Sequence, residues 1–553
     1  MPSAANSAPR LRRRRAGEPI GDVPLPVAAL AAITFVAHLG VAAWGPYELH
    51  RDALLYLAMG EHLQLFRMDF PPFIAILART ERLLGDSLVA IRLGPAVAHA
   101  ALIVIAAVIA RRAGGGAVAA LLAALVVATA PVFLRAGSLF QPVVFDQLWW
   151  TLTLYLLLRI GQEFASRRGR PVPIAGDDVV AHPVARSERR HWWLLGVVLG
   201  LGLLTKFTIL VLGAALLVGL LASPLRRRLA TPWPWAAAAL ALLIGSPSII
   251  GQVRLGWPFL GQFQDLQTVQ LSRVSPVSFT LEQLLLVGPI VLVAAAAAVR
   301  AALRSRDAGI RTVGWTTIAA YALMVIARGK PYYIAPIWPA LLGIGMARAE
   351  LWTRRLGGRR PLAAPVSWTL IGVAVVGFGV VGLPMGLPFL PPEPMARYAI
   401  RLGVTRAVTT NTGERLELPQ DYADMLGWKE LADSVTAVWD GLPPEDRERG
   451  VILATNYGRA GAIDFYGPDR LPPVIAPVGS YWFWGPGDRP GHVAIVVGDE
   501  PAELEGQYFR TATLARRVPK PWGVPEERDV PISIAREPVR ALQEVWPEFR
   551  GMN

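Results

Sequence analysis

The sequence has 553 residues, of which 53% are hydrophobic and 17% carry a charge, and its mean hydropathy is +0.40. This composition excludes a single soluble core and is typical of a polytopic membrane protein. The net charge of +14 does not indicate nucleic-acid binding, because the arginines cluster in short runs between apolar stretches, and the absence of cysteine excludes disulfides and thiolate chemistry.

Successive apolar runs, each near the roughly 20 residues that cross a bilayer as helix, predict the membrane-spanning segments. They lie at 26–45, 88–110, 116–134, 144–160, 192–222, 232–250, 281–302, 312–328, 332–349 and 364–388. Unbroken apolarity over this length excludes spanning strands. If 192–222 is two short crossings hinged near Thr205-Lys206, the arginines at 226–228 stay inside, and the total is about eleven helices.

Charge placement predicts the orientation and the domain organisation. Arg10 and the arginines at 12–15 precede the first apolar run, so the positive-inside rule keeps the N-terminus in the cytoplasm. Residues 1–25 are then a cytoplasmic segment, and 26–390 form a transmembrane domain whose first outer loop is 46–87. The other outer segments are the turn near 135–143, the neighbourhood of Lys206, 251–280, the turn at 328–332, and everything beyond about 389.

The composition becomes that of a soluble protein after Pro391-Pro392-Glu393-Pro394, which sets off 391–553 as a domain on the outer face. Helical periodicity at 426–442 and buried runs at 451–455 and 492–498 predict helices and strands there. The expected fold is therefore an α-helical polytopic membrane protein with a C-terminal soluble α/β domain.

Charged and aromatic residues gather in the first outer loop, whose pattern predicts two helices lying along the membrane. The candidate side chains there are Asp52, Tyr56, Glu61, His62 and Asp69. A partly buried interfacial carboxylate can take a proton from a hydroxyl, so Asp52 is the candidate base and the other four are candidate contacts to an acceptor or sugar. The alternative is that Asp52 caps a helix or pairs with Arg51.

Cations also stand at the outer ends of predicted spans, where a charge is costly and often functional. They are Lys206, Arg254 and Lys330, with Tyr332 and Tyr333 directly after Lys330. Such a group can hold a phosphate whose apolar tail lies between helices. The alternatives are that the lysines extend to lipid headgroups and that Arg254 meets a lipid phosphate.

Two further groups of residues are weaker candidates for a functional role. Asp146, near the start of a span, either faces the same cavity or caps its helix. His50, Glu61 and His62 lack the close two-histidine spacing of a zinc helix, so we expect no obligatory metal or cofactor.

Several strings occur in a recognisable order along the chain. They are Arg51-Asp52-Ala53-Leu54-Leu55-Tyr56-Leu57, Glu61-His62-Leu63, Asp69-Phe70-Pro71-Pro72, Gly85-Asp86-Ser87-Leu88, Thr205-Lys206-Phe207-Thr208, Gly329-Lys330-Pro331-Tyr332-Tyr333, and the stretches 423–428 and 456–467. Together they resemble the polytopic membrane glycosyltransferases of the GT-C superfamily, glycosyltransferase family 39, which includes protein O-mannosyltransferases and aminoarabinose transferases of lipid A. The chain departs from that pattern at Ala53, where the family has Glu, and at Phe70, where it has His.

The resemblance implies a glycosyltransferase of a bacterial cytoplasmic membrane that moves a hexose or pentose from a polyprenyl-phosphate donor to an outer-face acceptor, with inversion. It places Asp52 as the base and Lys206, Lys330 and Tyr332 around the donor phosphate. The acceptor is a lipid, polysaccharide or protein. Alternatives are a transporter or lipid flippase, and a degenerate non-catalytic binder; charges at one face and the lack of repeated halves favour the enzyme.

Overall fold

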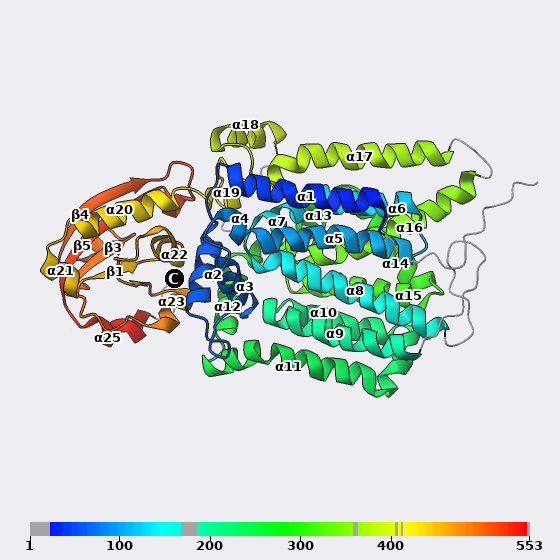
Figure 1. Ribbon diagram of the computed structural model, residues 1–553, viewed down its shortest axis with the longest axis horizontal. Helices are drawn as coiled ribbons and strands as arrows, with labels where there is room; N and C mark the ends of the chain where they lie inside the picture. The colour runs from blue at the N-terminus through cyan, green and yellow to red at the C-terminus, as the bar shows by residue number, and fades with distance from the viewer. Residues whose placement is uncertain (1–22, 167–184, 358–362, 404–407, 411–412, 550–553) are drawn as a thin grey trace, which may run out of the picture.

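The computed structural model describes residues 23–166, 185–357, 363–403, 408–410 and 413–549, so almost all of the expected cytoplasmic segment 1–25 lies outside the described residues. Figure 1 shows long helices running side by side and, at one end of them, a region that contains a β-sheet. Short helices of the first loop lie between these two parts.

The long helices coincide with apolar runs of the sequence. They are α1 (Leu25–Trp44), α5 (Leu93–Arg112), α8 (Pro142–Ser166), α9 (Ala185–Thr205), α11 (Pro232–Arg254), α15 (Ala308–Ile326), α16 (Trp338–Gly357) and α17 (Ala363–Gly386). By length and composition, six helices of the described residues can cross a membrane, or up to nine spans if each bent pair counts as one. The polytopic helical fold is confirmed, but the expected count of about eleven is not.

Three helix pairs are sharply bent, two of them within predicted crossings and the third at the end of the run 192–222. The pairs are α6 (Ala117–Thr129) with α7 (Pro131–Ser138) at 58°, α10 (Ile209–Leu221) with the 3-10 helix η1 (Pro224–Ala230) at 105°, and α13 (Pro276–Leu286) with α14 (Val291–Arg304) at 116°. Pro131 disfavours a helical Ala130, and Gly288, at φ 101°, precedes Pro289, so both breaks follow from local sequence. The runs at 116–134 and 281–302 are therefore not single straight helices.

The run at 192–222 is divided as expected, because α9 ends at Thr205 and α10 begins at Ile209. Lys206 lies in the break between them. Whether each half crosses the membrane stays a prediction.

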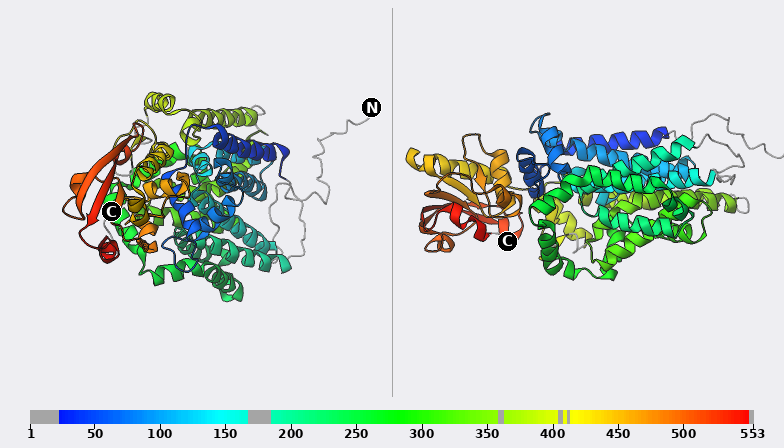
Figure 2. Two further views of the ribbon diagram at one scale, coloured as in Figure 1. Left: turned by 60° about the vertical axis from the view of Figure 1, so that its left-hand side comes forward. Right: turned by 90° about the horizontal axis from the view of Figure 1, so that it is seen from below.

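Shorter elements gather at the end of the bundle that faces the sheet (Figure 2). The first loop forms α2 (Arg51–Glu61) and α3 (Phe73–Arg82). The short α4 (Leu88–Ile91) follows it, so the long helix of the run predicted at 88–110 begins only at Leu93. Other segments of this end form α12 (Pro258–Val269), η2 (Leu271–Arg273), η3 (Pro331–Ile337) and α18 (Pro392–Leu402). The first loop, 251–280, the turn at 328–332 and the region beyond 389 therefore lie at one end of the bundle, and the assignment of that end to the outer face stays a prediction.

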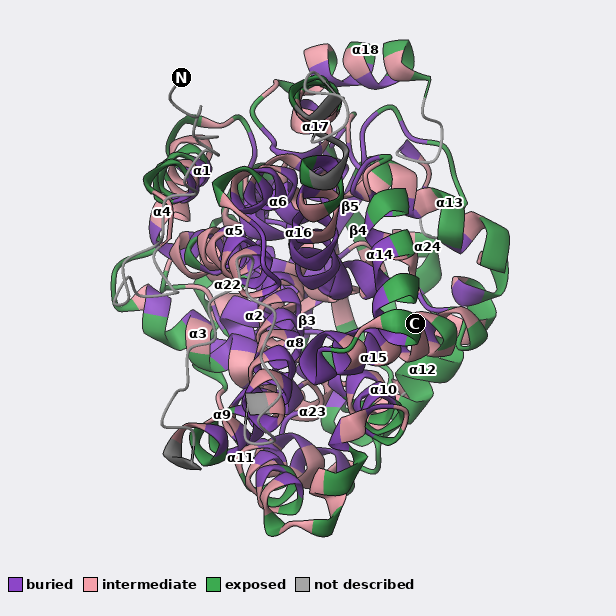
Figure 3. Ribbon diagram, turned by 90° about the vertical axis from the view of Figure 1, so that its right-hand side faces the viewer, coloured by how far each residue is buried: buried purple, intermediate pink, exposed green. Residues whose placement is uncertain are grey.

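Burial separates central helices from peripheral ones. In the view down the bundle from the end opposite the sheet, buried residues concentrate in α5, α6, α8 and α16 (Figure 3). The apolar window of α8 is 67% buried within the protein, whereas that of α17 is only 17% buried. Because both windows are apolar, α17 presents its side chains to lipid and α8 presents them to other helices.

The C-terminal region contains a five-stranded sheet of order β2-β1-β3-β5-β4. The strands are β1 (Val451–Ala454), β2 (Val474–Ile475), β3 (Val493–Val497), β4 (Phe509–Pro519) and β5 (Asp529–Pro538). β1 runs parallel to β2 and β3, and β5 runs antiparallel to β3 and β4. The strands predicted at 451–455 and 492–498 are thus β1 and β3, two of the three interior strands.

Successive residues of a strand face opposite sides of the sheet, so the apolar side chains of β3 must be covered on both faces. The helices of this region are α19 (Gln420–Ala423), α20 (Trp428–Asp440), α21 (Pro444–Arg449), α22 (Tyr457–Tyr466), α23 (Gly479–Trp484), α24 (Pro501–Leu504), η5 (Pro525–Glu527), α25 (Leu542–Val545) and η6 (Trp546–Phe549). Ile495 packs in one hydrophobic cluster with Leu431 of α20 and Ala460 of α22, and this cluster continues into α2 and the bundle. Val496, on the other face, packs with Trp546.

Close packing of α8 against α15 generates a prediction about stability. A Cβ atom on Gly309 would overlap the carbonyl of Leu158, and one on Gly161 would overlap the backbone of Gly309. We expect Gly309→Ala to lower the free energy of unfolding by about 1–3 kcal/mol, as overpacking of a tight interface does. Thermal unfolding of the purified protein in detergent measures this effect. Gly372→Ala is the matched control because its Cβ meets open space, and equal melting temperatures for the two variants would contradict the prediction.

Candidate functional site

A cavity of about 1180 Å³ lies where the bundle meets the C-terminal region. Its lining comes from helices α2, α7, α12 and α17 and the 3-10 helix η3, and from the C-terminal segments 419–424, 455–457 and 477–483. The predicted site residues among its lining are Asp52, Tyr56, Asp69, Lys330, Tyr332 and Tyr333. Segments far apart in sequence therefore converge on one space.

The remaining predicted site residues do not line this cavity. The Glu61 carboxylate forms an ion pair with Arg82 on α3, and the ring of His62 stacks on Trp484 at 4.1 Å between centroids. Arg254 is exposed at the end of α11, with its Nη1 3.5 Å from the carbonyl oxygen of Phe66. Lys206 lies behind two lining tyrosines. The structure thus removes Glu61, His62 and Arg254 from direct contact with the cavity.

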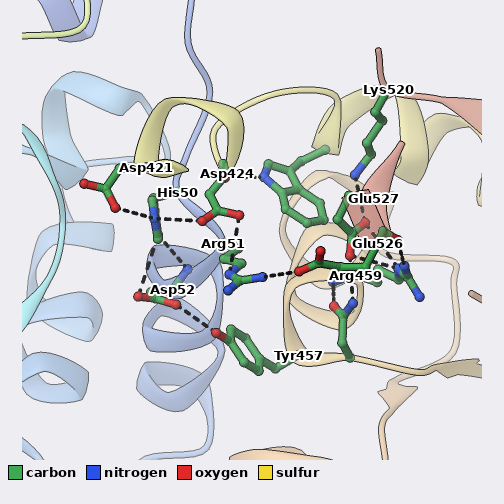
Figure 4. Close-up of polar contacts among 12 residues, drawn as sticks. His50, Arg51, Asp52, Asp421, Asp424, Tyr457, Arg459, Lys520, Glu526 and Glu527 are labelled. Atoms are coloured by element: carbon green, nitrogen blue, oxygen red, sulfur yellow. Dashed lines mark hydrogen bonds and ion pairs between the residues drawn. The ribbon is translucent and has the colours of Figure 1, made fainter. Parts of the chain in front are cut away.

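Asp52 is held by hydrogen-bond donors on both carboxylate oxygens, and Figure 4 shows the one from Tyr457. Tyr457 donates its hydroxyl to Oδ1 at 3.0 Å, and Gln141 donates its amide to Oδ2 at 3.1 Å. The carboxylate remains 31% exposed toward the cavity. Asp52 is not the N-cap of α2, because His50 occupies that position, and Arg51 pairs elsewhere; the capping and Arg51-pairing alternatives therefore do not describe this residue.

His50 is buried between Asp52 and two carboxylates of the C-terminal region (Figure 4). Its Nδ1 accepts the backbone amide of Asp52 at 3.0 Å, so the proton of the neutral ring lies on Nε2. Nε2 is 3.8 Å from Asp421 and 3.7 Å from Asp424. Burial lowers the pKa of His50, but Asp52, Asp421 and Asp424 outweigh burial and raise it.

Asp421 and Asp424 have different electrostatic settings although both face His50. Burial opposes ionisation of Asp421, but Arg135, which donates to it at 2.6 Å, outweighs burial and holds its pKa well below the usual range. Burial of Asp424 raises its pKa to about 6, because the Arg51 guanidinium 3.5 Å away only partly offsets desolvation. Asp421 is thus a fixed anion, whereas Asp424 titrates near neutral pH.

Tyr457 reaches Asp52 from the first residue of α22, and a buried network fixes that helix end. Asn456 caps α22 by accepting the amide of Arg459 at 2.9 Å and donates its own amide to Glu527 at 2.8 Å. Glu527 also pairs with Arg459 at 3.1 Å. Burial and the charge of Asp52 raise the pKa of Tyr457, so its hydroxyl stays protonated and can donate.

Another part of the cavity lining carries a cation and two tyrosines, which come from η3 and the residue before it. Lys330 precedes the 3-10 helix, and Tyr332 and Tyr333 lie in its first turn. Behind these rings, Nζ of Lys206 lies 4.3 Å from the centroid of Tyr333 and 5.5 Å from that of Tyr332. Lys206 therefore contacts the cavity through aromatic rings, at distances typical of cation–π interactions.

Asp146 is buried in α8 and accepts the hydroxyl of Thr208 at 2.9 Å, next to Lys206. It neither lines the cavity nor caps a helix, so both interpretations made from the sequence are wrong for this residue. Its carboxylate instead helps to hold the break between α9 and α10.

Within the described ranges, no group of three or more His, Asp or Glu side chains has the geometry to hold a metal ion. The expectation that no metal or cofactor is obligatory stays a prediction.

Sequence reasoning missed the polar residues that surround Asp52. They are His50 as a hydrogen-bonding partner, Gln141, Asp421, Asp424 and Tyr457. Asp424 and Tyr457 lie in the outer-domain stretches 423–428 and 456–467 that carried the resemblance, which was a usable signal for their importance. Gln141 has no comparable signal, because a single amide in a turn has no distinguishing pattern.

Comparison with known proteins gives one family and one fold. The model of the family dolichyl-phosphate-mannose-protein mannosyltransferase matches residues 69–169 and 180–250, which is less than half of the chain. A search of curated proteins finds no match.

Solved structures share the fold of most of the chain. The structure of ArnT from Cupriavidus metallidurans bound to undecaprenyl phosphate has a TM-score of 0.56 and 18% identity, and covers 92% of this chain and 97% of its own. The same protein in the apo state has a TM-score of 0.55 and 18% identity. The Archaeoglobus fulgidus oligosaccharyltransferase in the apo form has a TM-score of 0.50 and 12% identity. The match covers 80% of this chain and 63% of the oligosaccharyltransferase chain. The resemblance to GT-C membrane proteins is confirmed by the family match and by the fold.

Asp69 generates a prediction about ionisation. Burial raises the pKa of Asp69 to about 6, and the hydroxyl of Ser480, which donates to its carboxylate at 2.7 and 2.9 Å, limits the rise. Because that hydrogen bond favours the charged form, Ser480→Ala should move the pKa of Asp69 further upward. Infrared titration of the protonated carboxyl band measures the midpoint, with Asp69→Asn identifying the band. An unchanged or lower midpoint would contradict this assignment.

Proposed function

We propose that the chain is a membrane glycosyltransferase that transfers a sugar from a polyprenyl-phosphate donor to a hydroxyl acceptor. The observation that carries the proposal is the polarity of one cavity: Asp52 faces it from the first loop, and Lys330 with Tyr332 and Tyr333 faces it from the membrane helices. A sugar phosphate needs an anion to receive the acceptor proton and donors to receive the leaving charge. The matched family model and the GT-C fold support this reaction class.

In the proposed reaction, Asp52 takes the proton of the acceptor hydroxyl as the acceptor oxygen bonds to the anomeric carbon. The bond from that carbon to the phosphate oxygen breaks, and the phosphate leaves on its polyprenyl chain with one more negative charge. Attack opposite the leaving group inverts the anomeric configuration. Lys330 and the tyrosine hydroxyls stabilise the growing charge on the phosphate.

The shell around Asp52 suits it to act as this base. Its two donors, Tyr457 and Gln141, favour the carboxylate form and fix its orientation. Ala53, which stands where the family has a second acid, is fully buried and does not line the cavity. Asp421 and Asp424 supply negative charge near Asp52 from another part of the chain, so the departure at Ala53 does not leave Asp52 as the only carboxylate of the cavity.

The donor lipid has an apolar route to Lys330. Leu285 and Leu286 of α13 and Phe378, Val381 and Met385 of α17 line the same cavity. These helices lie at the lipid-facing side of the bundle, where an isoprenoid tail can enter between them. ArnT from Cupriavidus metallidurans, whose fold is similar, has been crystallised with undecaprenyl phosphate, which supports this class of donor.

We also propose that the N-terminus is cytoplasmic and that the domain 391–553 lies on the outer face of a bacterial cytoplasmic membrane. The arginine runs support this orientation. The acceptor hydroxyl then belongs to a lipid, polysaccharide or protein outside the cell.

A transporter or lipid flippase is the rival function. It would place ionisable groups along a path through the bilayer. In the described residues, the charged side chains that line the cavity gather at one end of the bundle, which favours chemistry at one face.

Asp52→Asn removes the proton acceptor at nearly constant volume, and we expect it to lower the transfer rate by about 10²–10⁴-fold while leaving donor binding intact. The measurement follows loss of labelled polyprenyl-phosphate sugars incubated with the protein in lipid nanodiscs. Wild-type turnover in the variant would refute the role of Asp52, and translocation without bond cleavage would favour the transporter.

Lys330→Ala should weaken donor binding and slow bond cleavage together, because the phosphate meets this cation in both the ground and the transition state. Separate kcat and KM values for the donor test this expectation. Arg254→Ala is the matched control, since Arg254 does not line the cavity, and we expect it to retain both constants. Equal losses in the two variants would indicate a general effect of surface charge.

Tyr457→Phe removes one hydrogen bond to the Asp52 carboxylate without changing the packing of the ring. Hydrogen bonds to charged groups contribute about 1.5–3 kcal/mol, so kcat should fall roughly 10–100-fold with little change in donor KM. A change confined to KM would place Tyr457 in donor binding instead.

A further inference from the structure

The wall of the cavity that the C-terminal region supplies is built from the ends of two parallel strands. Residues 455–457 follow β1, residues 477–479 follow β2, and both segments line the cavity. Carboxyl ends of parallel strands are where α/β sheets bind ligands. Helix α23 begins directly after the second segment and continues this wall with aromatic side chains.

Four aromatic residues follow one another at 481–484 of α23. Two of them are held by contacts within the protein, and the other two line the cavity. Tyr481 is buried and donates its hydroxyl to Asp464, and Trp484 stacks on His62. Trp482 and Phe483 are half-buried and line the cavity, with their rings edge to face at 5.0 Å between centroids.

Trp482 is fixed before any ligand binds. Its indole Nε1 donates to the carbonyl of Trp546 at 3.1 Å, and Nε1 of Trp546 donates to the carbonyl of Trp482 at 3.0 Å. Because its only polar atom is already bonded, this ring offers the cavity an apolar surface held in one orientation. A rigid aromatic surface binds at low entropic cost.

A carboxylate lines the same cavity as these rings and is attached to their helix. Asp69 is tied to α23 by the hydroxyl of Ser480, whose single proton is shared between the two carboxylate oxygens. A carboxylate has about four acceptor sites, so Asp69 keeps capacity for hydroxyl donors. The C–H face of a sugar ring matches the negative face of an aromatic ring, and its hydroxyl edge matches a carboxylate.

We propose that Trp482, Phe483 and Asp69 form a subsite for a sugar ring of the acceptor, so that the acceptor is a glycan or a glycosylated molecule. This inference rests on the proposed glycosyl transfer. The acceptor is favoured over the donor sugar because the donor phosphate binds at Lys330, on the wall supplied by the membrane helices, whereas α23 belongs to the C-terminal wall. The product is then a longer saccharide.

Saturation-transfer NMR tests the subsite directly. The probes are methyl glycosides of glucose, mannose and galactose, added to the full-length protein in nanodiscs with saturation of the aromatic protons. At least one glycoside should show saturated ring C–H protons in the wild type. Phe483→Ala should weaken its binding roughly fivefold or more, and Asp69→Asn should weaken it as well.

Matched controls keep the result interpretable. Phe389→Ala removes a partly exposed phenyl ring that does not line the cavity and should leave glycoside binding unchanged. Phe483→Leu keeps an apolar side chain of similar bulk, and it should lose binding while retaining the melting temperature of the wild type. Absence of saturation for every glycoside, or equal saturation in wild type and Phe483→Leu, would overturn the subsite.

Two further experiments complete the test. The first distinguishes an acceptor sugar from the donor sugar, and the second distinguishes failure of the subsite from failure of the proposed function. Saturating polyprenyl-phosphate sugar should leave the glycoside signal in place; its displacement would assign the subsite to the donor sugar and overturn the acceptor assignment. Donor cleavage is measured in the same preparation. Cleavage that depends on Asp52 without glycoside binding overturns the subsite alone, whereas absence of cleavage counts against the proposed function.

Discussion

Helix α22 packs on α2 so closely that a Cβ atom on Gly461 would lie 2.9 Å from the carbonyl carbon of Leu54. This contact continues the hydrophobic core of the bundle into the C-terminal region. One turn before Gly461, the same helix presents Tyr457 to Asp52. Glu48 strengthens the attachment from the loop side, because its carboxylate accepts the amide of Trp428 at 2.7 Å and so caps α20. The geometry around Asp52 depends on this docking more than on any single polar contact.

The docking creates a cavity with chemically distinct walls. The first loop and the C-terminal region contribute Asp52, Asp69, Asp421 and Asp424, while η3 and the residue before it contribute Lys330 and two tyrosines. Asp421 pairs with Arg135 and Asp424 with Arg51. Asp52 and Asp69 instead accept hydrogen bonds from neutral donors, so their negative charge remains available to a ligand. The proposed roles follow this division, with proton transfer and acceptor contacts at the acidic wall and phosphate contacts at the basic one.

Sequence patterns predicted the features that are local. Apolar runs located the long helices, the break at Lys206 followed from charge parity, and the interior strands β1 and β3 followed from their buried runs. Bends within spans were missed because the hydropathy of 281–302 does not reveal that Gly288-Pro289 interrupts the helix. Asp52, Lys330 and the tyrosines were found through charge at an interface. Their partners were not, because Gln141 and Tyr457 reach Asp52 only through tertiary packing.

The hydrogen bond between Tyr457 and Asp52 joins residues 405 positions apart. During synthesis, the ribosome completes every long helix of the bundle before α22 emerges, so a nascent chain that already has α2 and Lys330 still lacks the part of the cavity wall that the C-terminal region supplies. Until α22 has formed and docked on α2, Asp52 has Gln141 as a hydrogen-bond donor but not Tyr457. The polar surroundings of Asp52 are therefore completed only when translation is nearly finished.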